Sequence, residues 1–164
     1  MPLEIERKFL VTGDGWRRAV ARSELFRQGY LATTASSSVR VRVGGQRGWL
    51  SVKGRVVGMS RPEYEYEIPL AEANEMLAGF CAEGCLEKIR HWLPAGEREW
   101  EIDEFLGANA GLVVAELEIE SEDAEFERPA WLGREVTDDV RYYNASLAQR
   151  PYGSWPGGDD GEGS

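Results

Sequence analysis

Hydrophobic and polar residues alternate along most of this chain with a period of two, which is typical of β-strands. Turn residues separate most of the alternating segments. We therefore expect eight strands, at residues 3–12, 25–33, 37–44, 47–55, 60–69, 85–93, 98–105 and 111–121. Helical patterns are fewer and cover residues 15–24, 70–80 and 137–149, the last with Thr137 or Asp138 as its N-cap. Strands joined by short turns predict an antiparallel sheet or barrel with a few helices packed outside, an α+β fold.

Seven of the eight segments have one apolar face and one densely charged face. Side chains two positions apart on a strand share a face, so the opening stretch "EIERKF" places Glu4, Glu6 and Lys8 together. The other charged faces contain Arg40 and Arg42; Ser51 and Lys53; Arg61, Glu63, Glu65 and Glu67; Lys88 and Arg90; Glu99, Glu101 and Asp103; and Glu116, Glu118 and Glu120. Most of these runs have a single sign, and the basic ones use Arg, which binds phosphate with a planar fork.

Two arrangements fit these charged faces. For any single strand, an open sheet with its polar side in water is the simpler explanation, because exposed cross-strand ion pairs contribute little. For the whole set, a closed barrel of about eight strands with the charged faces inward encloses room for a small ligand. Such an interior must be wet and hold a highly charged ligand, because desolvating unpaired charge is costly. Divalent cations suit the carboxylates and phosphates suit the cations, so a metal–polyphosphate ligand satisfies both.

Composition narrows the class of partner. The chain has 164 residues, enough for one domain with a real core, and a formal net charge of −10. That charge opposes nucleic acid and anionic membranes at long range, so we expect neither as a partner. No stretch is apolar enough to span a membrane. No secretory signal is visible, and Cys81 and Cys85 are expected to be reduced. A cytoplasmic location follows from these features.

The last residues differ in composition from the rest of the chain. Glycine, serine and acidic residues dominate after Pro151, which is typical of a disordered segment. We therefore expect one domain at residues 1–151 and a disordered tail at residues 152–164. Arg141 and Asn144, on the last expected helix, could line one end of a barrel or simply pack against it.

In their order, these motifs resemble the CYTH superfamily, the triphosphate tunnel metalloenzymes. "EIERKF" matches the family's Glu-x-Glu-x-Lys opening, and "VRVR", "LSVKG", "RPEYEYEI", "LEKIRHWL", "WEIDEF" and "AELEIE" follow in the family's order. The stretch "WLGREVTDDVRYYNASLAQRP" is similar to the C-terminal helical segment of bacterial members, so the resemblance covers about residues 3–151. The "KIRH" motif departs from the common Lys-Thr-Arg-Tyr pattern. Ile89 and His91 lie on the opposite face from Lys88 and Arg90, so the phosphate contacts should persist.

The resemblance implies a closed eight-stranded antiparallel tunnel that acts on triphosphate compounds with Mg²⁺ or Mn²⁺. Carried over by position, the phosphate-binding residues would be Lys8, Arg40, Arg42, Lys53, Lys88 and Arg90, with Arg61 as a further contact. The metal ligands would be Glu4, Glu6, Asp103, Glu116 and Glu118. The residues closest to the chemistry would be Glu4, Glu6, Lys8, Glu63, Glu65 and Lys88.

The expected reaction is hydrolysis of inorganic triphosphate to diphosphate and phosphate by a monomer or homodimer. Relatives leave alternatives open: a class IV-like adenylate cyclase, a thiamine- or nucleoside-triphosphatase, and a sensor that binds polyphosphate or nucleotide without turnover. The sensor is disfavoured because binding alone would not need so many carboxylates.

Overall fold

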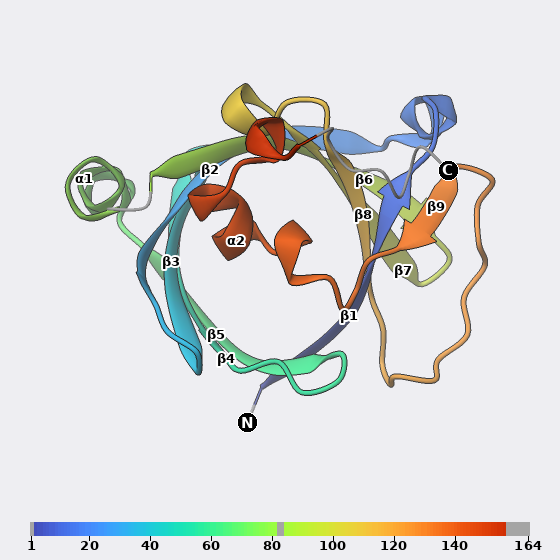
Figure 1. Cartoon of the computed structure of the whole chain (residues 1–164), viewed down its shortest axis with the longest axis horizontal. Coiled ribbons are helices and arrows are strands. Elements are labelled where there is room, and N and C mark those ends of the chain that lie inside the picture. The colour runs from blue at the N-terminus through green and yellow to red at the C-terminus, as the bar shows by residue number, and fades with distance from the viewer. Residues whose placement is uncertain (1, 82–83, 157–164) are drawn as a thin grey trace.

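Eight antiparallel strands close into a barrel in the computed structural model, which describes residues 2–81 and 84–156. The sheet order is β5-β4-β3-β2-β6-β7-β8-β1, and β1 also pairs with β5, which completes the ring seen in Figure 1. The strands are β1 (Leu3–Val11), β2 (Arg22–Thr33), β3 (Ser37–Gly44), β4 (Arg47–Gly54), β5 (Ser60–Ile68), β6 (Cys85–Ala95), β7 (Arg98–Phe105) and β8 (Val113–Glu118). The predicted closed barrel is confirmed.

Short helices complete the fold. They are η1 (Gly15–Ala19), α1 (Leu70–Phe80), η2 (Gly107–Asn109), η3 (Val140–Tyr142), α2 (Asn144–Gln149) and η4 (Tyr152–Ser154). A ninth strand, β9 (Leu132–Glu135), was not expected and pairs with the end of β1 at Phe9 and Val11. Among the described residues, no helix has the length and apolar composition that a membrane crossing requires.

The strand ends differ from expectation at β8, which spans Val113–Glu118 instead of residues 111–121, and near residue 22. The helix predicted over residues 15–24 is a short 3-10 helix, and β2 begins at Arg22 instead of residue 25. Arg22 pairs with Trp92, and Leu25 pairs with Ile89, across the β2–β6 ladder. The tertiary pairing therefore extends the strand at the expense of the local helical pattern.

The apolar outer faces of β1, β6, β7 and β8 form one core. Phe9, Leu93, Trp100, Ile102 and Leu117 are almost completely buried there. Trp16 of η1 packs against this core, together with a loop that contributes Phe126 and Trp131. The outward-facing apolar residues are thus covered by η1 and this loop. Because side chains alternate along a strand, the charged faces of the same strands point into the barrel.

The placement of α2 is the main difference from the expectation that the helices pack outside. Figure 1 shows α1 outside the ring and α2 within it. Leu147 of α2 is fully buried against Leu10, Leu86 and Phe105, which belong to inward-facing positions of β1, β6 and β7. The helix predicted over residues 137–149 is also split into η3 and α2. Neither Thr137 nor Asp138 caps it, and Asp139 accepts the cap hydrogen bond from the Arg141 amide.

The packed chain continues beyond the predicted domain end at residue 151. The Tyr152 amide donates to Asn109 Oδ1 at 2.8 Å, and the Trp155 ring lies 5.3 Å from that of Tyr142. Residues 152–155 therefore belong to the packed part of the chain, which corrects the expected start of the tail. Residues 157–164 of that expected tail lie outside the described residues.

Gly44 offers a test of the packing inside the barrel. A Cβ atom at this position would overlap the ring of Phe26. We expect Gly44→Ala to lower the free energy of unfolding by about 1–3 kcal/mol, the usual cost of overpacking. Gly79→Ala is the matched control, because a Cβ on this α1 residue meets nothing within 4 Å. Urea unfolding followed by circular dichroism measures both; equal stabilities for the two variants would contradict the packing described.

Candidate active site

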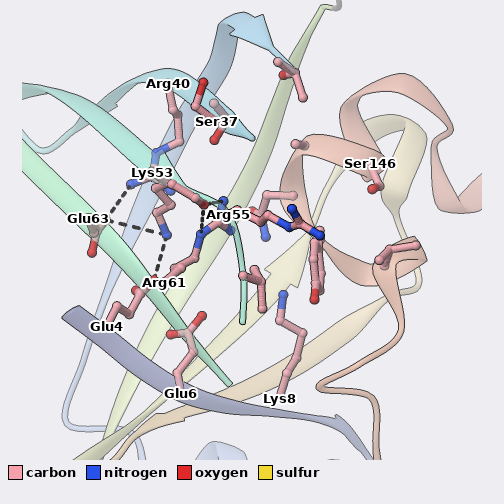
Figure 2. A pocket seen from close by; sticks show the side chains of 18 of the residues that line it. Glu4, Glu6, Lys8, Ser37, Arg40, Lys53, Arg55, Arg61, Glu63 and Ser146 are labelled. Atoms are coloured by element: carbon pink, nitrogen blue, oxygen red, sulfur yellow. Dashed lines mark hydrogen bonds and ion pairs between the residues drawn. The ribbon is translucent and has the colours of Figure 1, made fainter. Parts of the chain in front are cut away.

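The barrel encloses a cavity of about 680 Å³ into which the charged faces point (Figure 2). Every residue that the sequence predicted for the site lines this cavity, except Asp103. The lining members of that set are Glu4, Glu6, Lys8, Arg40, Arg42, Lys53, Arg61, Glu63, Glu65, Lys88, Arg90, Glu116 and Glu118. The open-sheet arrangement is thereby excluded.

Arg40 and Arg42, two arginines of β3, share the carboxylate of Glu65, and Arg40 Nη2 also lies 3.9 Å from Glu63 Oε2. Arg40 Nη2 lies 3.2 Å from Ser51 Oγ and 3.6 Å from Glu65 Oε2, and Arg42 Nη2 lies 3.3 Å from the same Glu65 oxygen. The Nε atoms of Arg40 and Arg42 are buried without a hydrogen-bond partner in the described part of the chain. Burial, reinforced by the charges of Arg40 and Arg90, lowers the pKa of Arg42 to about 9. An anion placed here would relieve both deficits.

Phe26 of β2 lies beneath two of these cations. Its ring centroid is 4.7 Å from the Arg42 Cζ atom and 5.6 Å from the Arg90 Cζ atom. Trp49 and Trp92 pack edge-on against Phe26, at centroid distances of 6.4 and 6.0 Å. This aromatic cluster holds the guanidinium groups through cation–π attraction without adding negative charge. Arg90 is in addition paired with Asp103 and Glu101.

Asp103 lies behind the cavity wall and binds two lining cations. Its Oδ1 accepts from Arg90 Nε at 2.8 Å, and its Oδ2 lies 2.8 Å from Lys88 Nζ and 2.9 Å from Arg90 Nη2. These cations hold the pKa of Asp103 well below its usual range, although burial opposes them. Both oxygens are thus bound by cations of the chain, and the role of Asp103 as a metal ligand stays a prediction. In this structure Asp103 orients Lys88 and Arg90.

The C-terminal segment contacts the two buried lysines. Lys88 Nζ donates to Asn144 Oδ1 at 2.7 Å, and Lys8 Nζ donates to the Tyr142 carbonyl at 3.2 Å. Gln28 also donates to Asn144 Oδ1, at 3.1 Å. Burial lowers the pKa of Lys88 to about 7, against the attraction of nearby carboxylates. Asn144 was expected either to line one end of the barrel or to pack against it, and in the structure it lines the cavity.

Glu6 and Glu118 form a facing pair of carboxylates. They are direct cross-strand neighbours on β1 and β8, and neither forms an ion pair within residues 2–81 and 84–156. By contrast, Glu4 Oε1 lies 3.2 Å from Lys53 Nζ, and Glu116 Oε2 lies 3.3 Å from Lys8 Nζ. Burial, followed by the charges of Glu116 and Glu4, raises the pKa of Glu6, and burial with Glu4 also raises that of Glu118. A cation between these two strands would offset the excess negative charge.

The donor set near Glu6 and Glu118 suits a hard divalent cation. Carboxylate oxygens are the ligands that Mg²⁺ and Mn²⁺ prefer. The residues described do not contain a group of three or more such side chains already drawn together around a metal position. Glu6 and Glu118 are therefore the carboxylates most available to a metal, whereas Glu4 and Glu116 are shared with lysines.

Several lining residues were missed or left unassigned by the sequence. Glu101 and Arg55 line the cavity, and each is in phase with an assigned neighbour, Asp103 and Lys53 respectively. That phase was a usable signal for both. The roles of Gln28 and Phe26 had no local signal, because they depend on which strands lie beside β2.

A closed antiparallel barrel whose interior gathers arginines, lysines and carboxylates around one cavity defines a charged tunnel suited to a polyanion and a metal. The chain belongs to the CYTH domain family, whose model matches residues 2–152. It is 50% identical over 152 residues to an inorganic triphosphatase of Acetivibrio thermocellus, covering 93% of this chain and 97% of that protein. It is 42% identical over 152 residues to an inorganic triphosphatase of Nitrosomonas europaea, covering 88% of this chain and 96% of that protein.

Solved structures agree with the barrel fold. The crystal structure of the inorganic triphosphatase NE1496 matches with a TM-score of 0.62 and 37% identity, over 89% of this chain and 97% of that one. The PH1012 protein from Pyrococcus horikoshii matches with a TM-score of 0.59 over 73% of this chain and 80% of that one. At 20% identity, the second likeness concerns the fold alone.

Neutralising variants of two neighbouring carboxylates should have opposite effects on stability in metal-free buffer at pH 8. The pKa of Glu6 is raised in the folded protein. Glu6 therefore stabilises the folded state below its unfolded pKa of about 4.3, and this stabilisation is lost as pH rises through the folded pKa. The pKa of Glu116 is lowered, so its contribution is present above the unfolded pKa and is lost only as pH falls.

We therefore expect Glu6→Gln to raise the free energy of unfolding at pH 8 and Glu116→Gln to lower it. Each change should be on the order of 1 kcal/mol, the equivalent of about one pKa unit. Urea titration with a chelator present measures both variants side by side. Destabilisation of similar size in both variants would show that the folded protein stabilises the ionised Glu6 carboxylate, contrary to this expectation.

Proposed function

We propose that this protein hydrolyses inorganic triphosphate to diphosphate and phosphate inside the barrel, with Mg²⁺ or Mn²⁺ as the metal. The observation that carries the proposal is the meeting of two unsatisfied sets in one cavity. Among the described residues, Arg40 and Arg42 have buried Nε atoms without a hydrogen-bond partner, and the facing carboxylates of Glu6 and Glu118 form no ion pair. The names of the two relatives at 50% and 42% identity support the same substrate.

The phosphates would lie against the cations of β1, β3, β4, β5 and β6. Arg40, Arg42 and Arg90 supply planar guanidinium groups, which match phosphate oxygens in pairs. Lys8, Lys53 and Lys88 add compact charges, and Arg61 is a further contact. Phosphoryl transfer depends mainly on positioning and on neutralising charge at the equatorial and leaving oxygens. Asp103 would contribute indirectly, by orienting Lys88 and Arg90.

The metal would be held by Glu6 and Glu118, with help from Glu116 and Glu4 when substrate draws their lysines away. When bound, it would neutralise charge on the phosphates and lower the pKa of bound water. Between the two candidate bases of β5, Glu65 accepts from Ser51 at 3.0 Å and from Arg42 at 3.3 Å. Glu63 has only longer contacts, 3.6 Å to Lys53 and 3.9 Å to Arg40. We therefore assign proton removal from the attacking water to Glu63 and orientation of Arg42 to Glu65.

Loss of one interior arginine should remove most of the activity. We expect Arg42→Ala to lower kcat/KM for triphosphate about 100-fold, a typical loss when one electrostatic contact to a transition state is deleted. Phosphate release with Mg²⁺ or Mn²⁺ measures it. Arg27→Ala is the control, because Arg27 is on the outer side of β2, 4.0 Å from Glu87.

The same assay separates the rival activities. ATP as the preferred substrate with cyclic AMP as product would identify a cyclase, and faster hydrolysis of ATP or thiamine triphosphate than of inorganic triphosphate would identify a nucleoside- or thiamine-triphosphatase. Tight triphosphate binding by calorimetry, without phosphate release under any metal condition, would identify a sensor and reject the hydrolase assignment.

Chelation should abolish hydrolysis, and either Mg²⁺ or Mn²⁺ should restore it. Glu118→Gln removes one member of the facing carboxylate pair, so the metal concentration for half-maximal activity should rise about tenfold or more. Glu87→Gln, which changes an exposed glutamate on β6, is the charge-matched control. An identical metal requirement in all three proteins would place the metal away from the β1–β8 pair.

A further inference from the structure

A second cluster of reactive side chains lies on the outer face of the barrel, away from the tunnel cavity. His91 is the only histidine of the chain and follows Arg90, which lines the cavity, so the alternation along β6 directs its ring outward. Ser23 of β2 is its direct cross-strand neighbour, and Glu104 of β7 reaches the ring from the other side. The tunnel chemistry uses none of these three side chains.

The three side chains form one continuous series of hydrogen bonds. Ser23 Oγ lies 2.6 Å from His91 Nδ1, and His91 Nε2 lies 3.0 Å from Glu104 Oε1. A hydroxyl within hydrogen-bond reach of a base, with the base oriented by a third group, is the arrangement that activates a serine. The two ring nitrogens are used in the opposite order from the serine–histidine–aspartate triad of the proteases, but the roles of the three groups are the same.

The carboxylate of Glu104 determines which ring nitrogen accepts a hydrogen bond. Arg17 donates to both of its oxygens, at 3.3 and 3.1 Å, and these bonds lower the pKa of Glu104. Because an ionised carboxylate can only accept, the proton between His91 and Glu104 is on Nε2. In the neutral ring Nδ1 is then the acceptor, so the Ser23 hydroxyl donates to it. The hydroxyl proton is therefore directed at the base.

The base is held in place, whereas the hydroxyl is accessible. His91 is buried, and its ring centroid lies 4.9 Å from that of Trp16, which restrains the imidazole. Ser23 is exposed, so a reagent in solution can reach its Oγ atom. Leu25, two residues along the same face of β2, is 50% exposed and pairs with Ile89. This apolar pair offers a contact for a short acyl chain beside the hydroxyl.

We propose that Ser23 is an acylation site, at which the hydroxyl activated by His91 takes an acyl group from activated esters. Ser23 Oγ forms a bond to the carbonyl carbon while His91 Nδ1 takes the hydroxyl proton. The bond from the carbonyl carbon to the leaving oxygen then breaks, and the leaving group departs with the electron pair and receives the proton from His91. The products are acyl-Ser23 and a free alcohol or phenol, with no other reactant.

Glu104 acts as a positioning residue in this step, because it holds the ring through Nε2 and does not touch the ester. The face around Ser23 is open to water, so we assign to it a single acyl transfer and not rapid turnover. The site is independent of the tunnel and of the hydrolysis proposed there.

The test treats the full chain with p-nitrophenyl acetate and follows the acetylation of individual residues by peptide mass spectrometry. Ser23 should be acetylated, and His91→Gln should slow this reaction about 100-fold, a typical contribution of a general base. Glu104→Gln should also slow it, and Glu104→Asp, which keeps the carboxylate, should recover part of the rate. Ser121, an exposed serine that donates to Asp123 Oδ1 at 2.8 Å, is the internal reference.

Acetylation of Ser23 no faster than that of Ser121 overturns the site, and so does an equal rate in the wild type and His91→Gln. If His91→Gln loses its near-ultraviolet circular dichroism, the Glu104 pair decides. A rate unchanged in Glu104→Gln rejects the activation, whereas a loss in Glu104→Gln that Glu104→Asp partly restores supports it. Ser23→Ala should lose this acetylation and retain the hydrolysis of triphosphate, because the hydroxyl lies outside the tunnel.

Discussion

Charge pairing across strands is the constraint on which this barrel depends. An ion taken from water into a protein interior carries a large penalty unless a partner and hydrogen bonds compensate it. The antiparallel register supplies those partners: Lys8 lies opposite Glu116, Arg90 opposite Asp103 and Lys53 opposite Glu63. A slip of one residue in any ladder would turn an entire charged face outward and an apolar face inward. The same pairs therefore specify the fold and shape the cavity.

The pairing is incomplete at two places, and both belong to the candidate site. Arg42 is buried near two other arginines, and its low pKa records the repulsion among them together with the loss of solvent. Glu6 is in the corresponding position among carboxylates. Each group makes the protein less stable than a fully paired interior would, so the binding of a polyanion and a metal would stabilise both groups at once. Binding of the polyanion and the metal would therefore restore the stability that is lost at Arg42 and Glu6.

Strand alternation is a local property, and this explains what the sequence could predict. The phase of "RPEYEYEI" alone determines that Glu63 and Glu65 share a face, so the lining set followed without knowledge of the sheet order. The position of Asp103 behind Lys88 and Arg90 did not follow, because it depends on the register between β6 and β7. The contacts of Phe26 with Arg42 and Arg90 required β2 to lie between β3 and β6, an arrangement that consecutive hairpins do not predict. Likewise, the six residues of α2 are too few to reveal whether they pack inside or outside.

A net charge of −10 is compatible with a polyphosphate site because the two act over different distances. Repulsion from surface carboxylates is screened beyond about 8–10 Å at physiological salt, whereas the interior arginines act at contact in a poorly screened space. The side chains that line the cavity therefore influence binding more than the total charge does. Serine hydroxyls and Arg55 line its β2–β3 and β4–β5 side, together with the carboxylate of Asp138. Binding then depends on a local excess of cations that the composition of the whole chain conceals.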